Sequence, residues 1–174
     1  MTLTTGAAVL LVVAAGVLGL LIGSFLNVVV HRVPQGASVV SPPSACPGCG
    51  ARIRWYDNVP VVSWLVLRGR CRDCAEPISG RYPLVELVTG VAFAAVAVAA
   101  VWGGVSGWVV PALLYAAAIS VALTLIDLDV RRLPDPIVLP SYPVLLVLLA
   151  VASAGTGDWW ALARAAIGAV VTAR

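Results

Sequence analysis

The chain has 174 residues, of which 61% are hydrophobic and only 11% are charged, and its mean hydropathy is +1.02. A water-soluble globule of this length could not bury so much apolar surface, so the composition excludes that class and indicates an integral membrane protein. The net charge of +3 includes eleven basic residues, all of them Arg. In a membrane protein, the side on which each Arg lies is more informative than this total.

The first predicted element is an uncharged run of 26 residues, Thr5 to Val30. About 20 helical residues cross the hydrocarbon layer, so this run predicts a transmembrane helix. A cleaved signal peptide is the alternative, but no basic residue precedes the run and its apolar part is too long for an h-region. Positive charge begins at His31 and Arg32, so we expect the N-terminus outside and the next segment in the cytoplasm.

Residues 31–83 form the second predicted unit, a polar cytoplasmic domain that holds seven of the eleven Arg and all four Cys. The cysteines form two C-x-x-C pairs separated by 21 residues. Each pair can hold a metal from a tight turn, and Gly48 and Gly50 give the first turn backbone freedom. The predicted zinc ligands are Cys46, Cys49, Cys71 and Cys74.

Two disulfides are the alternative use of these cysteines. The Arg-rich loop indicates a reducing compartment, so we favour zinc. A zinc ion held by four thiolates has no open position, so its predicted role is structural and not catalytic.

The remaining membrane core, residues 84–174, is predicted to hold four more helices, which makes about five in an all-α polytopic fold. Trp102 and Trp108 flank an uncharged turn, as expected at an outer interface. Every loop with more than one Arg then falls on one face of the membrane. Arg164 does not fit this pattern, because it lies inside the last expected helix. The four expected helices are Leu84–Val101, Trp108–Ile126, Ile137–Ser153 and Trp159–Thr172.

Acidic residues interrupt this core at three places, one of which is Asp158 in the turn before the last expected helix. Asp127, Asp129 and Asp135 lie between the third and fourth helices, next to two arginines, and on spacing alone they are best explained as a helix end in water. Glu86 is interpreted in the same way, as an anion in the first turn of the second helix, where the helix dipole favours it.

Four motifs, in this order, resemble those of the type IV prepilin peptidases, a family of polytopic bacterial membrane aspartyl proteases. They are Gly23-Ser-Phe-Leu-Asn-Val-Val-Val-His-Arg-Val-Pro34, the two C-x-x-C pairs with Asn58-Val-Pro60 between them, Ile78-Ser-Gly-Arg-Tyr-Pro-Leu-Val-Glu86, and Asp127-Leu-Asp-Val-Arg-Arg-Leu-Pro-Asp135. The resemblance covers the whole chain and implies a multi-pass protein of the bacterial inner membrane.

The resemblance changes the interpretation of Asp127, which matches the first of two catalytic aspartates in the family, with Asp129 and Asp135 as supporting residues. It implies cleavage of the leader of prepilins or pseudopilins at the cytoplasmic face. It also implies methylation of the new N-terminus with S-adenosylmethionine in many members. The chemistry needs two carboxylates that share a proton, one to activate water and one to polarise the scissile carbonyl.

The second family aspartate follows a G-x-G-D motif, and Gly155-Thr-Gly-Asp158 fits that pattern. However, the 19 residues from Pro136 to Ala154 span about 28 Å as a helix, so Asp158 is expected on the opposite side of the membrane from Asp127. Trp160 also stands where the family usually has Lys. We therefore expect the second aspartate beyond Arg174 and a truncated chain that is inactive alone.

A second function class remains open. A non-catalytic membrane protein could keep the zinc loop and bind pilins or assemble with a pilus or secretion machine. Binding of nucleic acid by the Arg-rich loop is not expected, because these arginines are explained as orientation signals beside anionic lipid.

Overall fold

A computed structural model describes the backbone of residues 4–172, without the side chains of residues 166 and 168–172. The described part is mostly helical, with a largely irregular segment between residues 36 and 80, and its only β-type pairings are two isolated bridges in that segment. The helices are α1 (Thr5–Arg32), α2 (Val62–Val66), α3 (Arg81–Val101), α4 (Val110–Val130), α5 (Asp135–Thr156) and α6 (Trp159–Thr172), with short 3-10 segments η1 (Val33–Gln35) and η2 (Trp55–Asn58).

Four helical segments of the described part are long and apolar enough to cross a membrane. They are Thr5–Gln35, Arg81–Val101, Val110–Val130 and Asp135–Thr156. The helical membrane fold predicted from the sequence is therefore confirmed, but the number of five crossings is not. The fifth predicted segment forms α6, which has 14 residues, fewer than the about 17 to 25 that cross the hydrocarbon layer.

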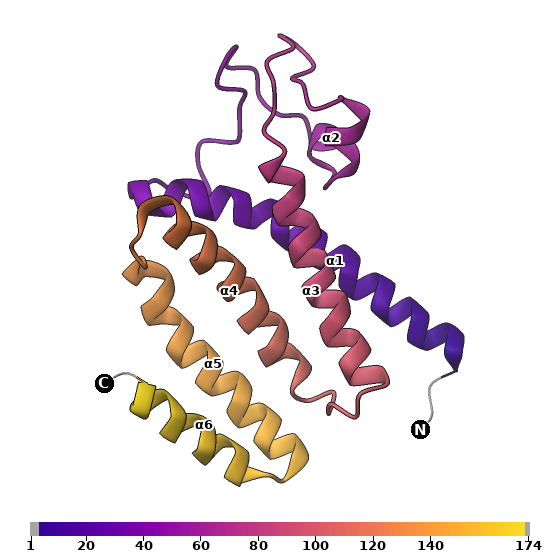
Figure 1. Cartoon of the computed structure of the whole chain (residues 1–174), viewed down its shortest axis with the longest axis vertical. Coiled ribbons are helices and arrows are strands. Elements are labelled where there is room, and N and C mark those ends of the chain that lie inside the picture. Colours follow the sequence, from indigo (N-terminus) through magenta and orange to yellow (C-terminus); the bar gives the residue numbers. More distant parts are fainter. Residues whose placement is uncertain (1–3, 173–174) are drawn as a thin grey trace.

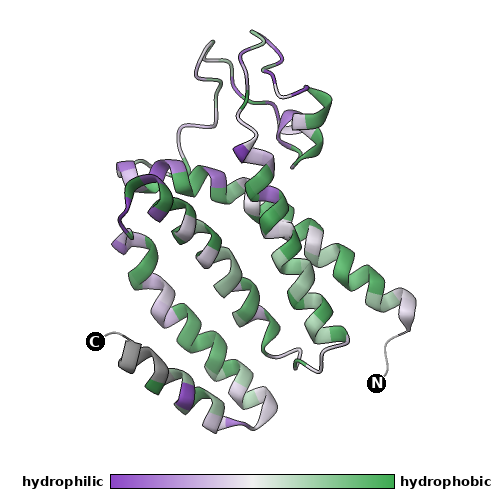
Figure 2. Ribbon diagram, in the orientation of Figure 1, coloured by the Kyte–Doolittle hydropathy of each residue, from purple (hydrophilic) through white to green (hydrophobic). Residues whose placement is uncertain are grey.

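The helices α3, α4, α5 and α6 lie side by side in chain order, and α1 packs along α3 (Figure 1). The domain between α1 and α3 stands at one end of this layer. Hydrophobic residues cover most of the helical surfaces, and hydrophilic residues gather in that domain and at the helix ends nearest to it (Figure 2). The molecule thus has one polar end.

Glycines allow α1 and α3 to approach closely. A Cβ atom at Gly19 would come within 2.6 Å of the Thr89 carbonyl oxygen, and one at Gly23 within 2.7 Å of the Glu86 Cα atom. Small residues at helix crossings are a common means of packing in membranes, where backbones that approach closely gain dispersion contacts. Gly23 opens the first family motif, so this part of the motif has a packing role.

An apolar cluster holds α1, α3 and α4 together near the polar end. It consists of the buried residues Leu26, Val30, Val85, Ala122 and Ile126. Ile126 has no exposed surface and directly precedes Asp127. Packing of this one side chain therefore fixes the position of the last turn of α4.

Several helix ends differ from their expected positions by two to four residues, including two within the motifs. The helix α4 runs to Val130, four residues past Ile126, and ends where Arg131 adopts a left-handed conformation with φ of 52°. Asp127 and Asp129 therefore belong to the last turn of a helix. The helix α3 begins at Arg81, three residues before the expected Leu84, because Pro83 is compatible with the first turn of a helix, where its missing N–H has no partner to lose.

Candidate functional site

The first C-x-x-C pair lies in a tight hairpin. The Cys46 N–H donates to the Ala51 carbonyl (2.9 Å), and the Gly50 N–H donates back to the Cys46 carbonyl (2.9 Å). Gly50 has a φ of +71°, a conformation that L residues adopt at a cost. Gly48, which was expected to give similar freedom, is not among the glycines with positive φ in the described residues.

The second pair repeats this hairpin with the same hydrogen bonds. The Cys71 N–H donates to the Glu76 carbonyl (2.8 Å), and the Ala75 N–H donates to the Cys71 carbonyl (3.0 Å). Ala75 takes the place of Gly50 and has a φ of +60°. The two turns are therefore equivalent in backbone geometry although their sequences differ.

The hairpins bring the four sulfur atoms together. All four lie within 4.8 Å of one another, and the Sγ atoms of Cys46 and Cys74 are 3.7 Å apart. Sulfurs about 2.3 Å from a tetrahedral zinc would be about 3.8 Å apart, whereas a disulfide needs about 2.05 Å. All four cysteines are free, so their arrangement fits a tetrahedral metal and not two disulfides.

The pKa values of Cys46 and Cys74 also favour a bound cation. The backbone N–H groups of Cys49 and Gly48 lower the pKa of Cys46 to about 7. The Glu76 N–H lowers the pKa of Cys74, but desolvation and the three neighbouring cysteines outweigh it and raise that pKa to about 12. Ionisation of one cysteine therefore opposes ionisation of the next. A divalent cation would stabilise all four as thiolates.

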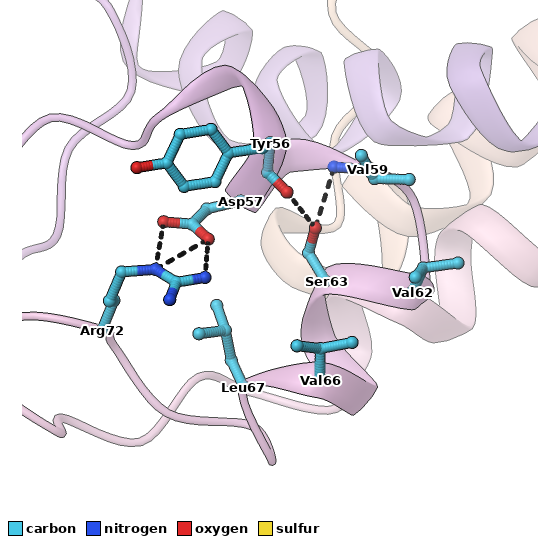
Figure 3. A pocket seen from close by; sticks show the side chains of 8 residues that line it. All are labelled: Tyr56, Asp57, Val59, Val62, Ser63, Val66, Leu67 and Arg72. Atoms are coloured by element: carbon cyan, nitrogen blue, oxygen red, sulfur yellow. Dashed lines mark hydrogen bonds and ion pairs between the residues drawn. The ribbon is translucent and has the colours of Figure 1, made fainter.

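Ion pairs connect the two hairpins. Arg72 lies between the two cysteines of the second pair in the sequence. Its guanidinium is 2.6 Å from the carboxylate of Asp57 (Figure 3). Asp73 accepts a hydrogen bond of 2.9 Å from Arg54. The hydrogen bonds from Arg72 lower the pKa of Asp57 below its usual value. Asp57 is largely buried, so this contact fixes the segment after the first hairpin onto the second hairpin.

Glu86 attaches the domain to the membrane helices. It lies in the second turn of α3 and is buried, and its Oε2 atom accepts a hydrogen bond of 2.7 Å from the Val61 N–H. Val61 has a φ of +61° and ψ of −49°, a strained conformation for a β-branched residue. The interpretation of Glu86 as a first-turn anion is therefore wrong, and its role is to hold this turn.

The other predicted site residue, Asp127, lies at the polar end of the helical layer. Its side chain is exposed, and among the described residues it takes part in no ion pair. Two residues further along α4, Asp129 binds Arg81 at the start of α3 through two parallel contacts of 2.8 Å and 2.7 Å. This fork geometry connects the motif at the start of α3 to the motif at the end of α4.

Asp158 lies at the opposite end of α5 from Asp135. The 22 residues of α5 extend about 33 Å at 1.5 Å per residue, and Asp127 is at the end of α4 that connects to the start of α5 (Figure 1). The structure therefore does not bring Asp127 and Asp158 together.

Each polar or glycine residue of the G-x-G-D segment has a local role. A side chain at Gly155 would overlap the indole ring of Trp108. Gly157 ends α5 in a left-handed conformation with φ of +75°. Asp158 accepts a hydrogen bond of 3.0 Å from the Ala161 N–H, as a residue before the first turn of a helix does. This segment is thus a turn between two helices.

Sequence reasoning missed the contacts Glu86–Val61 and Arg81–Asp129. Glu86 and Asp129 both lie inside family motifs that the sequence shows, but a motif does not reveal which distant residue each side chain contacts. Partners distant in sequence, 25 and 48 positions apart, leave no periodic signal that one sequence could show.

Fold and site together define a polytopic membrane protein that carries a four-thiol metal-type domain on one end of its helices. Residues 17–100, from the middle of α1 to the end of α3, match the family model described as the bacterial peptidase A24 N-terminal domain. Residues 17–100 therefore belong to this domain family, which confirms the resemblance found in the motifs.

Named relatives extend the similarity further along the chain. A "prepilin leader peptidase/N-methyltransferase" of Myxococcus xanthus is 51% identical over 124 residues, which cover 71% of this chain and 36% of that protein. One of Neisseria gonorrhoeae is 41% identical over 150 residues, covering 72% and 51%. A "type 4 prepilin-like proteins leader peptide-processing enzyme" of Escherichia coli is 44% identical over 141 residues, covering 71% and 51%.

The chain therefore spans about half the length of these relatives, or less. No solved structure shows a significant match.

Proposed function

We propose that this chain forms part of a membrane aspartyl endopeptidase that cleaves the leader of prepilins or pseudopilins, and that Asp127 supplies one of its two carboxylates. The observation that supports this most is the exposed Asp127 carboxylate at the polar end, beside the ion pair that connects two family motifs. The names of the relatives supply the substrate class.

The proposed chemistry needs a second carboxylate close to Asp127, so that one activates water while the other, protonated, polarises the scissile carbonyl. The chain has eight acidic residues. Three are in the four-cysteine domain, Glu86 is buried against Val61, and Asp158 lies about 33 Å away along α5. The other two, Asp129 and Asp135, lie with Asp127 where α4 ends and α5 begins, and Asp129 is engaged by Arg81. Asp158 is therefore not the proposed partner.

Zinc is the proposed occupant of the four-cysteine cluster, held by Cys46, Cys49, Cys71 and Cys74. Such an ion would supply folding free energy to a domain with little apolar core, and it would leave no coordination position for a substrate. We assign residues 31–83 to this domain and the helices from α3 onward to the peptidase core.

Methylation of the new N-terminus is a second proposed activity, supported only by the names of the relatives. The larger pocket between α3 and α4, about 310 Å³, is lined mainly by aliphatic side chains. It does not offer the polar groups that S-adenosylmethionine needs, so we assign no residue of this chain to that cofactor.

The proposed location is the bacterial inner membrane, with the N-terminus outside and both the four-cysteine domain and Asp127 in the cytoplasm. The arginines at the polar end support this orientation, because basic residues accumulate on the cytoplasmic side of membrane proteins.

A chimera tests the proposal. In it, this chain replaces the similar part of the Myxococcus xanthus relative, and leader cleavage of a prepilin is followed by the shift of the pilin band on a gel. We expect cleavage by the chimera, its loss in Asp127→Asn, and its retention in Asp158→Asn. Cleavage that survives Asp127→Asn, at equal protein level, would refute the proposed role of Asp127. A chimera that binds the prepilin but does not cleave it would favour a pilin-binding protein.

A further inference from the structure

The short helix α2 of the four-cysteine domain exposes an apolar face without a partner among the described residues. Val62, Leu65 and Val66 are 55%, 62% and 70% exposed. In a helix, positions three and four apart share one face, so these three side chains form one surface. Val62 and Val66 also line an open pocket of about 80 Å³ beside Asp57 and Arg72 (Figure 3).

The contact between Glu86 and Val61 sets the depth of this face. The residue before α2, Val61, is hydrogen-bonded to the Glu86 carboxylate, which lies five residues into α3 and so about 7.5 Å from its start. Counting about 20 residues back from Trp102 places the boundary of the hydrocarbon near residue 82. Glu86 lies four residues, or about 6 Å, inside this boundary, so the start of α2 reaches the edge of the hydrocarbon layer.

A second contact orients α2 at that level. The Trp64 indole N–H donates to the Ile78 carbonyl at 3.0 Å, just before α3 begins, and the Trp64 ring covers Gly69. Trp64 thus points toward Gly69 and the start of α3, and Leu65 lies on a different side of α2, next to Val62 and Val66 at the mouth of the pocket. Leu84, in the first turn of α3, is also apolar and 59% exposed.

Two positively charged side chains lie next to the apolar helix α2 in the chain. Arg68 and Arg70 follow α2 directly, and both are exposed. Neither takes part in an ion pair among the described residues. Apolar side chains at the hydrocarbon edge with adjacent arginines are the arrangement by which helices lie in the interface of anionic membranes.

We propose that α2 is an interfacial anchor, whose face of Val62, Leu65 and Val66 inserts into the bilayer interface while Arg68 and Arg70 bind anionic headgroups. The anchor and the Glu86 contact would fix the four-cysteine domain against the membrane. This inference does not depend on the proposed peptidase activity.

Photo-cross-linking tests the anchor. The chain carrying p-benzoylphenylalanine at position 65 or 66 is placed in nanodiscs of phosphatidylethanolamine and phosphatidylglycerol, irradiated, and analysed by intact mass. The control is position 40, because Val40 is also apolar and 86% exposed but lies in the domain far along the chain from α2 and α3. We expect lipid adducts at 65 and 66, several-fold above those at 40.

Two further results decide the outcome. Replacing both arginines, Arg68→Gln with Arg70→Gln, should reduce the adduct at position 65 in discs with phosphatidylglycerol and not in discs without it. Equal lipid adducts at 40 and 65 would overturn the proposal. So would a cross-link from position 65 to a second copy of the chain, or to added prepilin, in preference to lipid.

Discussion

At the residue scale, the two hairpins of the four-cysteine domain provide an internal comparison. The residue after the second cysteine of each pair has a positive φ, and it is Gly50 in one hairpin and Ala75 in the other. The left-handed conformation costs an L residue about 1–2 kcal/mol. The second hairpin carries this strain and the first does not, although their hydrogen bonds are the same.

Exchanging glycine and alanine at these two positions should change the zinc affinity differently in the two hairpins. Gly50→Ala should lower zinc affinity about tenfold, because about 1.4 kcal/mol of strain would oppose the bound, folded state. Ala75→Gly should leave affinity unchanged or raise it slightly, since relief of strain is partly offset by greater freedom of the unfolded chain. Competition with a chromogenic chelator measures both. Equal losses in both variants would contradict the equivalence of the hairpins.

At the element scale, the crossing of α1 and α3 depends on which face of α1 carries glycine. Gly16, Gly19 and Gly23 are spaced so that all lie toward α3, but the room at each differs. A Cβ at Gly16 would have ordinary contacts, the nearest at 3.7 Å to the Ala94 Cβ atom, whereas one at Gly19 would overlap the backbone of α3. The backbone cannot move aside as a flexible side chain can.

A matched pair of alanine variants tests this packing. Gly16→Ala and Gly19→Ala add the same methyl group to the same helix, so their effect on helix propensity is the same. We expect Gly19→Ala to destabilise the α1–α3 contact by about 1–3 kcal/mol through overpacking, and Gly16→Ala to be neutral. Thermal unfolding in detergent is the measurement. A similar loss of stability in Gly16→Ala would show that the helices are further apart or in another register.

At the scale of the whole molecule, the parts predicted from sequence are those with a local signal. Uncharged runs indicated the helical membrane fold, and paired cysteines indicated the cluster that the structure assembles. Helix ends were less accurate, because Asp127 and Asp129 are polar and still continue α4 to Val130. The buried Glu86 was misinterpreted, since its partner Val61 comes from a turn with no distinctive composition.

The central claim is that Asp127, in the last turn of α4, and Asp158, just after α5, lie on opposite sides of the membrane, so that Asp158 is not the proposed partner of Asp127. Epitope insertion tests this most directly. A short epitope is placed after Val40 in the four-cysteine domain, after Arg132 beside Asp127, or after Gly157 beside Asp158, and antibody binding is compared in right-side-out and inside-out vesicles. We predict that the epitopes after Val40 and Arg132 share one face and that the epitope after Gly157 is on the other. Binding to the epitopes after Arg132 and Gly157 on the same face would contradict the account.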